Sequence, residues 1–130
     1  MQRPLEIVLA DDEPIVRKRL KLALEKDGYR VEVYEDGSDV LRRIQEKTFD
    51  IVVTDVRMED VDGIRVLQET IAQSSRTKVI IITGYASVEI AREALAKGAF
   101  DLIAKPFKPN DLREIIERAA SELRRQEAVQ

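Results

Sequence analysis

The sequence predicts an α/β protein, built on a doubly wound, five-stranded parallel sheet with the strand order 2-1-3-4-5. Five short runs rich in β-branched residues alternate with five stretches of helical periodicity. The runs "IVLA", "IVVT" and "VIIIT" are apolar throughout, which is typical of parallel strands that helices cover on both faces. The chain has 130 residues, which is too few for the eight strand–helix units of a closed barrel.

The positions of the strands are predicted from these apolar runs and from one run with an alternating pattern. The run "VEVY" alternates apolar and polar residues, which favours a strand at the edge of the sheet. The expected strands span residues 5–10, 30–34, 50–54, 78–82 and 100–104.

The helices are expected between and after these strands. Pro14 can begin the first helix, where its missing N–H is not needed, and Gly28 ends it. Gly98 ends the fourth helix, and the fifth begins near residues 109–111. The residues predicted to face the sheet recur every three or four positions. They are Val16, Leu20, Ala23 and Leu24, then Val40, Leu41 and Ile44, then Ile64, Leu67 and Ile71, then Val88, Ala91 and Leu95, and finally Leu112, Ile115, Ile116, Ala119 and Leu123.

The repeated units predict right-handed crossovers and helices on both sides of the sheet. Five such units favour the flavodoxin-like (βα)5 arrangement. The tail "SELRRQEAVQ" continues the fifth helix as a polar extension, either a frayed end or the start of a connector. We therefore expect one domain over residues 1–123, with residues 124–130 as a helical extension or the start of a linker to an absent output domain.

Composition excludes several classes of chemistry. The chain has no cysteine and no histidine, so thiolate and imidazole catalysis and the common zinc sites are excluded. No apolar run is long enough to span a bilayer, and the charged first residues do not fit a signal peptide, so a cytoplasmic protein without a membrane partner is expected. The net charge of −3 does not suggest a nucleic-acid surface.

The topology predicts where a ligand binds. In open sheets of this order, the site lies beyond the carboxyl ends of the strands, between strands one and three. Asp11 and Asp12 follow strand one, and Asp55 follows strand three, so three carboxylates should converge there. Strands four and five bring Thr83 and Lys105 to the same rim. No comparable cluster is expected at the amino ends of the strands.

This set of side chains predicts a metal site. Each acidic residue alone is adequately explained as a cap on the next helix, and Thr83 and Lys105 alone as ordinary surface residues. Capping does not explain why Asp55 and Lys105 should face Asp11 and Asp12. Carboxylate ligands without sulfur or imidazole favour Mg²⁺, for which Mn²⁺ can substitute, and Mg²⁺ is often completed by phosphate oxygens. An aspartate can itself accept a phosphoryl group.

Four motifs in this order resemble the receiver domain of two-component response regulators. The resemblance extends from Leu5 to about Leu123. The motifs are the acidic pair Asp11–Asp12, the phosphoacceptor motif "DVRMEDVDG" with Asp55, Met58 and Gly63, the switch hydroxyl Thr83 in "IITGYA", and "KPFKPNDL" from Lys105 to Leu112.

The resemblance implies a role for each matching residue. Asp55 would accept a phosphoryl group from a sensor histidine kinase, forming an aspartyl phosphate. Asp11, Asp12, Asp55 and the backbone carbonyl of Arg57 would hold Mg²⁺. Lys105 would pair with Asp55 and then with the phosphoryl oxygens. Thr83 would move toward the phosphoryl group and reshape the fourth helix, fifth strand and fifth helix.

The resemblance also implies partners and a cis peptide bond. A phosphorylation-dependent homodimer would use the reshaped surface, and the kinase would dock on the first helix. No other cofactor and no direct nucleic-acid binding by this domain are expected. The bond between Lys105 and Pro106 is a candidate cis peptide.

Some positions depart from the family pattern or modify it. Glu59 replaces the usual proline, which adds a negative charge after Asp55. Leu102 replaces the switch aromatic, and Phe100 or Tyr85 could take its place. Arg57 and Tyr85 lie two residues after Asp55 and Thr83, and their bulk is expected to slow hydrolysis of the phosphoryl group.

Two other functions remain alternatives. A receiver-like docking module that works without phosphorylation would not need the acceptor and the lysine, and both are present. A magnesium phosphatase usually needs a second catalytic acid two residues after the nucleophile, where this chain has Arg57. We therefore expect a switch that catalyses its own phosphotransfer and dephosphorylation but is not a conventional turnover enzyme.

Overall fold

The computed structural model describes residues 3–56, 62–84 and 88–129, and it confirms the predicted sheet. All pairings are parallel and the order is β2-β1-β3-β4-β5. Each predicted strand lies within one residue of the observed one. The elements are β1 Glu6–Ala10, α1 Pro14–Lys26, β2 Arg30–Tyr34, α2 Gly37–Glu46, β3 Ile51–Asp55, α3 Gly63–Gln73, β4 Lys78–Thr83, α4 Val88–Ala96, β5 Asp101–Ala104 and α5 Pro109–Val129.

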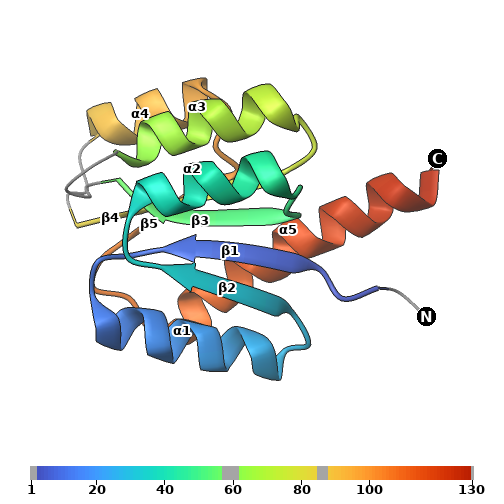
Figure 1. Ribbon diagram of the computed structural model, residues 1–130, viewed down its shortest axis with the longest axis horizontal. Coiled ribbons are helices and arrows are strands. Elements are labelled where there is room, and N and C mark those ends of the chain that lie inside the picture. Colours follow the sequence, from blue (N-terminus) through green and yellow to red (C-terminus); the bar gives the residue numbers. More distant parts are fainter. Residues whose placement is uncertain (1–2, 57–61, 85–87, 130) are drawn as a thin grey trace.

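The helices cover both faces of the sheet (Figure 1). α1 and α5 lie on one face, and α2, α3 and α4 lie on the other. Gly28 and Gly98 follow α1 and α4 with φ of 93° and 104°, a conformation that L side chains rarely adopt. The described part of the chain contains no helix that is both long and apolar enough to cross a membrane.

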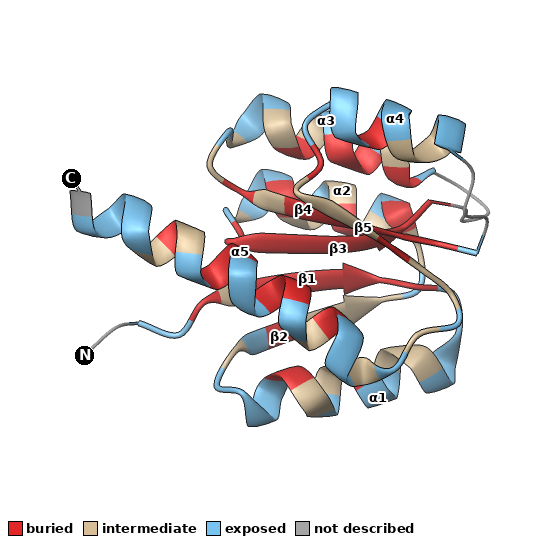
Figure 2. Cartoon of the chain, turned by 180° about the vertical axis from the view of Figure 1, so that it is seen from behind, coloured by how far each residue is buried: buried red, intermediate tan, exposed pale blue. Residues whose placement is uncertain are grey.

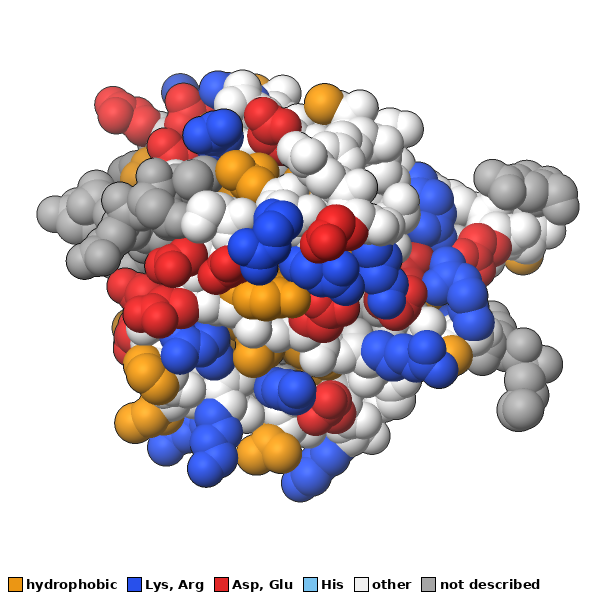
Figure 3. Space-filling model, viewed as in Figure 1, with side chains coloured by type: hydrophobic (Ala, Val, Ile, Leu, Met, Phe, Trp, Pro, Cys, Tyr) orange, Lys and Arg blue, Asp and Glu red, His pale blue; other side chains and the backbone are white. Residues whose placement is uncertain are grey.

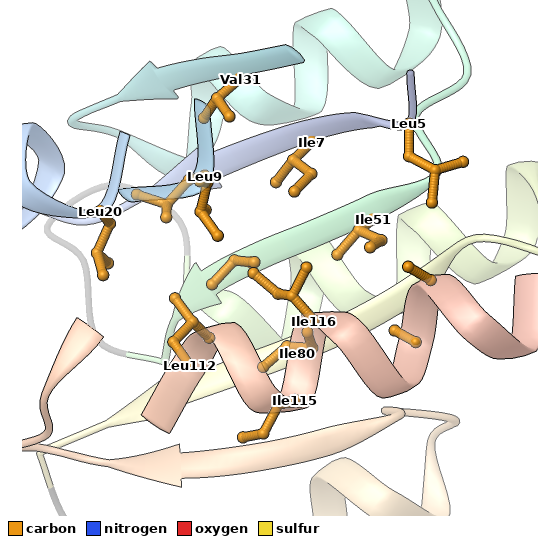
Figure 4. Close-up of a cluster of buried hydrophobic side chains, with 14 of the residues drawn as sticks. Leu5, Ile7, Leu9, Leu20, Val31, Ile51, Ile80, Leu112, Ile115 and Ile116 are labelled. Atoms are coloured by element: carbon orange, nitrogen blue, oxygen red, sulfur yellow. The ribbon is translucent and has the colours of Figure 1, made fainter. Parts of the chain in front are cut away.

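The larger core lies between the sheet and the pair α1 and α5 (Figure 4). Ile7 and Leu9 of β1 and Ile51 of β3 point from the sheet toward Ile116 and Leu112 of α5. All five side chains are fully buried. Burying one such side chain contributes on the order of 2 kcal/mol, so this core fixes α5 firmly against the sheet.

The second core lies on the other face, and there the prediction for α4 is wrong. Val88 is 67% exposed and Leu95 is 53% exposed, whereas Ala94 is buried and Ile90 packs against the core. Val88 and Leu95 are seven residues apart and share one side of the helix, and Ile90 and Ala94 lie on the opposite side. The small Ala94 lets α4 lie close to the sheet, which leaves the larger side chains in solvent.

Figure 2 shows how burial is distributed over these layers. β1 and β3 are buried along nearly their whole length, while the far end of α5 is exposed. The tail after Leu123 continues as helix to Val129, as expected of a polar extension. The division of the chain at residues 123 and 124 stays a prediction.

Candidate functional site at the carboxyl ends of the strands

The register of the sheet brings the ends of β1 and β3 together. Ala10 lies opposite Thr54, so Asp11, which follows β1, lies beside Asp55, the last residue of β3. Figure 3 shows acidic side chains gathered at the left-hand edge, which is where the strand arrows point in Figure 1. The register therefore places Asp11 and Asp55 at the edge of the sheet where the ligand site was predicted.

The three carboxylates form one cluster. One oxygen from each of Asp11, Asp12 and Asp55 lies within 4.8 Å of the others. Asp11 and Asp55 are buried, with 0% and 6% of their surface exposed, while Asp12 is exposed. Like charges at such separations repel by about 1 kcal/mol in water and by more where burial lowers the dielectric constant. The cluster therefore carries an unfavourable interaction that a bound cation would relieve.

Lys105 brings a positive charge to this cluster. Its Nζ lies 3.0 Å from Oδ2 of Asp11 and 3.1 Å from Oδ2 of Asp55. Its backbone N–H donates to the carbonyl of Thr83 at 2.7 Å, which holds the ends of β4 and β5 together. The Lys105–Pro106 peptide is cis, as predicted.

The charges alter the pKa values of Asp11 and Lys105. Burial raises the pKa of Asp11, although the N–H of Glu13 and the ammonium of Lys105 oppose this rise. Burial by itself lowers the pKa of Lys105, but its contacts with Glu13, Asp11 and Asp55 outweigh that effect and raise it. Within the described residues, the ammonium of Lys105 is thus shared among three carboxylates, those of Asp11, Glu13 and Asp55.

One buried oxygen supports a bound metal. Oδ1 of Asp11 accepts from the N–H of Glu13 at 2.8 Å, but Oδ2 receives no hydrogen bond of good geometry within the described residues. A buried oxygen without a donor is costly unless something else binds it. The ion pair with Lys105 only partly compensates, so the donor set fits a hard divalent cation.

Gly63 places the start of α3 directly against the backbone of Asp55. A Cβ at Gly63 would lie 2.3 Å from the backbone oxygen of Asp55, too close for any other residue without backbone movement. The N–H of Gly63 donates to the carbonyl of Val56 at 2.8 Å. The spacing of the phosphoacceptor motif thus has a steric cause, because the start of α3 packs on the backbone that carries Asp55.

The switch positions are only partly described. Thr83 is 2% exposed at the end of β4, on the rim where it was predicted. Leu102 packs against the core beneath α4, whereas Phe100 packs against the core beneath α5. Phe100 therefore lies in a different layer and does not take the place of Leu102. Arg57, Glu59 and Tyr85 lie outside the described residues.

Sequence reasoning missed the role of Glu13. It is the N-cap residue of α1, yet within the described residues its side chain makes no cap hydrogen bond. Its carboxylate instead accepts from Lys105 at 2.5 Å, while its side chain is 57% exposed. An acidic residue directly before Pro14 is typical of a helix cap, so its sequence position does not indicate this ion pair. Only the fold shows that Lys105 is within its reach.

Charged residues also gather at the amino ends of the strands, contrary to prediction. Asp50 lies just before β3 and is 3% exposed. Its oxygens accept from both terminal nitrogens of Arg3, from Arg76 and from the N–H of Glu6, at 2.8–2.9 Å. Arg3 and Arg76 each also donate to Glu127 of α5 at 2.8 Å. The sequence did not predict this cluster, because Arg3 and Arg76, which balance the charge of Asp50, lie far from it along the chain.

Comparison with known proteins decides the family. Residues 7–117 match the response regulator receiver domain. The chain belongs to this family. Regulatory protein AtoC of Escherichia coli (strain K12) is 40% identical to this chain over 113 residues, which are 87% of this chain and 24% of AtoC.

Solved structures agree with this assignment. A CheY-like receiver domain from Methanospirillum hungatei JF-1 has a TM-score of 0.90 and 30% identity, covering 95% of this chain and 98% of that one. The beryllofluoride-activated NtrC4 receiver domain dimer has a TM-score of 0.85 and 31% sequence identity, and the match covers 91% of this chain and 98% of the NtrC4 chain. This receiver domain is thus a phosphorylation-activated switch of the two-component type rather than a turnover enzyme, and a docking module without phosphorylation is not favoured.

The receiver domain is only part of its larger relatives. It spans about a quarter of the curated relatives AtoC and ZraR, 24% and 27% of their lengths. The activities that AtoC and ZraR owe to the rest of their length therefore cannot be assigned to this chain.

Proposed function

We propose that Asp55 is the phosphoacceptor of this receiver domain. The observation that carries the proposal is that Lys105 lies 3.1 Å from Asp55, which shares a carboxylate cluster with Asp11 and Asp12. An oxygen of Asp55 would attack phosphorus in a phosphohistidine of a sensor kinase. The bond from phosphorus to the imidazole nitrogen breaks, and the imidazole leaves with the electron pair.

The cation in this proposal is Mg²⁺, with Mn²⁺ able to substitute. Asp11, Asp12, Asp55 and the backbone carbonyl of Arg57 would hold it. When bound, it would neutralise the charge that develops on the transferring oxygens. Oδ2 of Asp11 supports this assignment, because within the described residues its one contact is the ion pair with Lys105, which leaves this buried oxygen able to bind a metal ion.

The other residues position the phosphoryl group or transmit its presence. Lys105 would neutralise one phosphoryl oxygen, and the buried hydroxyl of Thr83 would bind another. Leu102 would respond to that movement from the core beneath α4. Arg57 and Tyr85 would limit the approach of water, so that their bulk slows autodephosphorylation.

The kinase would dock on α1. An open pocket beside the site is lined by residues of α1 and of the segment after β5, among them Val16, Leu20, Phe107 and Pro109. Ile15 of the same wall is 65% exposed. An apolar surface next to Lys105 suits a partner helix that carries the phosphohistidine.

We also propose a phosphorylation-dependent homodimer and the domain division already predicted. The exposed Val88 and Leu95 of α4 offer apolar contacts for a dimer through α4, β5 and α5. The NtrC4 receiver domain was solved as a beryllofluoride-activated dimer, which makes the same behaviour testable here by light scattering with and without beryllofluoride. Residues 1–123 would form the receiver, and residues 124–130 would lead toward an output domain.

Phosphorylation of Asp55 is tested by intact-mass spectrometry after incubation with Mg²⁺ and a small phosphodonor. The wild type should gain one phosphoryl group per chain, and Asp55→Asn should gain none. Asp39→Asn is a matched control, because Asp39 lies on α2 and its ion pair within the described residues is with Arg42. It should be phosphorylated like the wild type.

Other outcomes would contradict the proposal. Modification that persists in Asp55→Asn would place the acceptor elsewhere. Continuous release of phosphate from many esters would indicate a phosphatase. A wild type that shows no response to Mg²⁺ and phosphodonor would indicate the docking module.

A further inference from the structure

The ion pair between Glu13 and Lys105 is a contact that phosphoryl binding must disturb. An ammonium has three N–H donors. Around Lys105, three carboxylates already lie within hydrogen-bond distance: Glu13 at 2.5 Å, Asp11 at 3.0 Å and Asp55 at 3.1 Å. A phosphoryl oxygen that approaches this ammonium must therefore compete with carboxylates that already surround it, and Glu13 is the one that accepts a hydrogen bond from it.

Glu13 is the carboxylate that can withdraw most easily. Asp11 is fully buried, and the side chain of Asp55 is 8% exposed and carries the new group. The Glu13 side chain is 57% exposed, so water can solvate it as soon as it leaves Lys105. Its backbone remains fixed, because its N–H donates to Oδ1 of Asp11. Release therefore needs only a rotation of the side chain.

We propose that Glu13 is an internal competitor for Lys105, which holds the ammonium in the resting state and is displaced when the phosphoryl group arrives. This inference rests on the proposed function of Asp55. Glu13 opposes the active state in two ways, because it occupies a donor of Lys105 and places a negative charge beside the incoming phosphoryl oxygens. Glu13 is thus a positioning residue that acts through Lys105.

The competition predicts that removing Glu13 strengthens binding at the site. Exposed ion pairs are worth up to about 1 kcal/mol, so Glu13→Gln should bind beryllofluoride roughly fivefold more tightly in saturating Mg²⁺. Glu13→Asp keeps the charge but is shorter by one methylene group, so its affinity should lie between the two. A loss of structure would weaken binding, and a gain therefore distinguishes competition from a merely structural role.

The experiment is a calorimetric titration of beryllofluoride into the Mg²⁺-saturated wild type, Glu13→Gln, Glu13→Asp and a charge control. Glu114→Gln is the matched control, because Glu114 is exposed on α5 and has no ion pair within the described chain. It should bind like the wild type. An equal gain in Glu114→Gln would assign the effect to net charge and overturn the proposal, as would unchanged or weaker binding in Glu13→Gln.

Two further readouts keep the explanations apart. If Glu13 were a metal ligand, Glu13→Gln would lose more than about tenfold in affinity for Mg²⁺ alone, and that result would also overturn the proposal. A wild type that binds no beryllofluoride would refute the proposed function itself. A wild type that binds it, with no gain in Glu13→Gln, would refute only the competition.

Discussion

The two ends of β3 carry buried aspartates in opposite electrostatic situations. Asp50, at the amino end, accepts from two arginines and a backbone N–H, and these contacts lower its pKa to about 2 although burial opposes them. At the carboxyl end, Asp55 shares one lysine with Asp11, whose pKa burial raises. Within the described residues, the first cluster is complete, with two arginines on one aspartate, and the second is incomplete, with one lysine shared by several carboxylates.

The difference separates a structural charge cluster from a functional one. The cluster around Asp50 joins the segment before β1, the segment before β4 and the end of α5 through Arg3, Arg76 and Glu127. The cluster around Asp55 joins strand ends as well, but among the described residues it contains a buried oxygen, Oδ2 of Asp11, whose one contact is an ion pair without good hydrogen-bond geometry. The balanced charges around Asp50 stabilise the fold, whereas the excess of carboxylates around Asp55 favours binding of a cation and, with it, a phosphoryl group.

The largest expected change in stability comes from removing Asp50, the centre of the complete cluster. Asp50→Ala should lower the free energy of unfolding by about 3 kcal/mol, because it removes a buried anion that holds two arginines and leaves the N–H of Glu6 without its partner. Urea unfolding measures this loss. Asp39→Ala, which removes the pair with Arg42 and an acidic residue from the first turn of α2, should change stability by about 1 kcal/mol or less. Equal losses in the two variants would show that the Asp50 cluster contributes no more to stability than a single ion pair on α2.

Acid should weaken the same cluster. The folded pKa of Asp50 is about 2, below its ordinary value of 3.8, so its ionised form is favoured by folding. Its stabilisation is therefore fully present above about pH 4 and is lost as the pH falls through 2, an effect of about 2 kcal/mol. Urea unfolding near pH 5 and near pH 2 should show a smaller acid loss in Asp50→Ala than in the wild type. The same acid loss in both proteins would contradict this assignment.

The incomplete cluster should respond in the opposite direction. Without metal, Asp11→Asn should raise the free energy of unfolding by about 1 kcal/mol, because it removes a buried charge from a crowded site. The amide oxygen can still accept from the N–H of Glu13. Urea unfolding in the presence of a chelator measures the change. A destabilised Asp11→Asn would mean that the ion pair with Lys105 outweighs the crowding.

Most of the fold and the main site residues could be predicted from the sequence because their signals are local. Apolar runs define the strands, and the topology then requires Asp11, Asp55, Thr83 and Lys105 to meet at one edge. The side of α4 that faces the sheet could not be predicted, because Val88 and Leu95 form as plausible an apolar stripe as Ile90 and Ala94. Only packing against the sheet decides between the two stripes.

The ion pairs of Glu13 and Asp50 were missed for a different reason. Arg3 and Arg76 lie 47 and 26 residues from Asp50, and Lys105 lies 92 residues from Glu13. No spacing rule connects residues so far apart, and long flexible side chains reach their partners only in the folded protein. A backbone topology locates strand ends but does not choose between several carboxylates near one ammonium.

The effect of Mg²⁺ on the stability of three proteins compares the two clusters most directly. A cation that completes the Asp55 cluster should raise the free energy of unfolding of the wild type by about 2.7 kcal/mol when free Mg²⁺ is a hundred times its dissociation constant. Asp50→Ala should show the same increment from a lower starting stability, and Asp11→Asn should show almost none. A wild type that Mg²⁺ does not stabilise, or an Asp11→Asn protein stabilised as much as the wild type, would contradict the claim that this site is built to receive a metal ion.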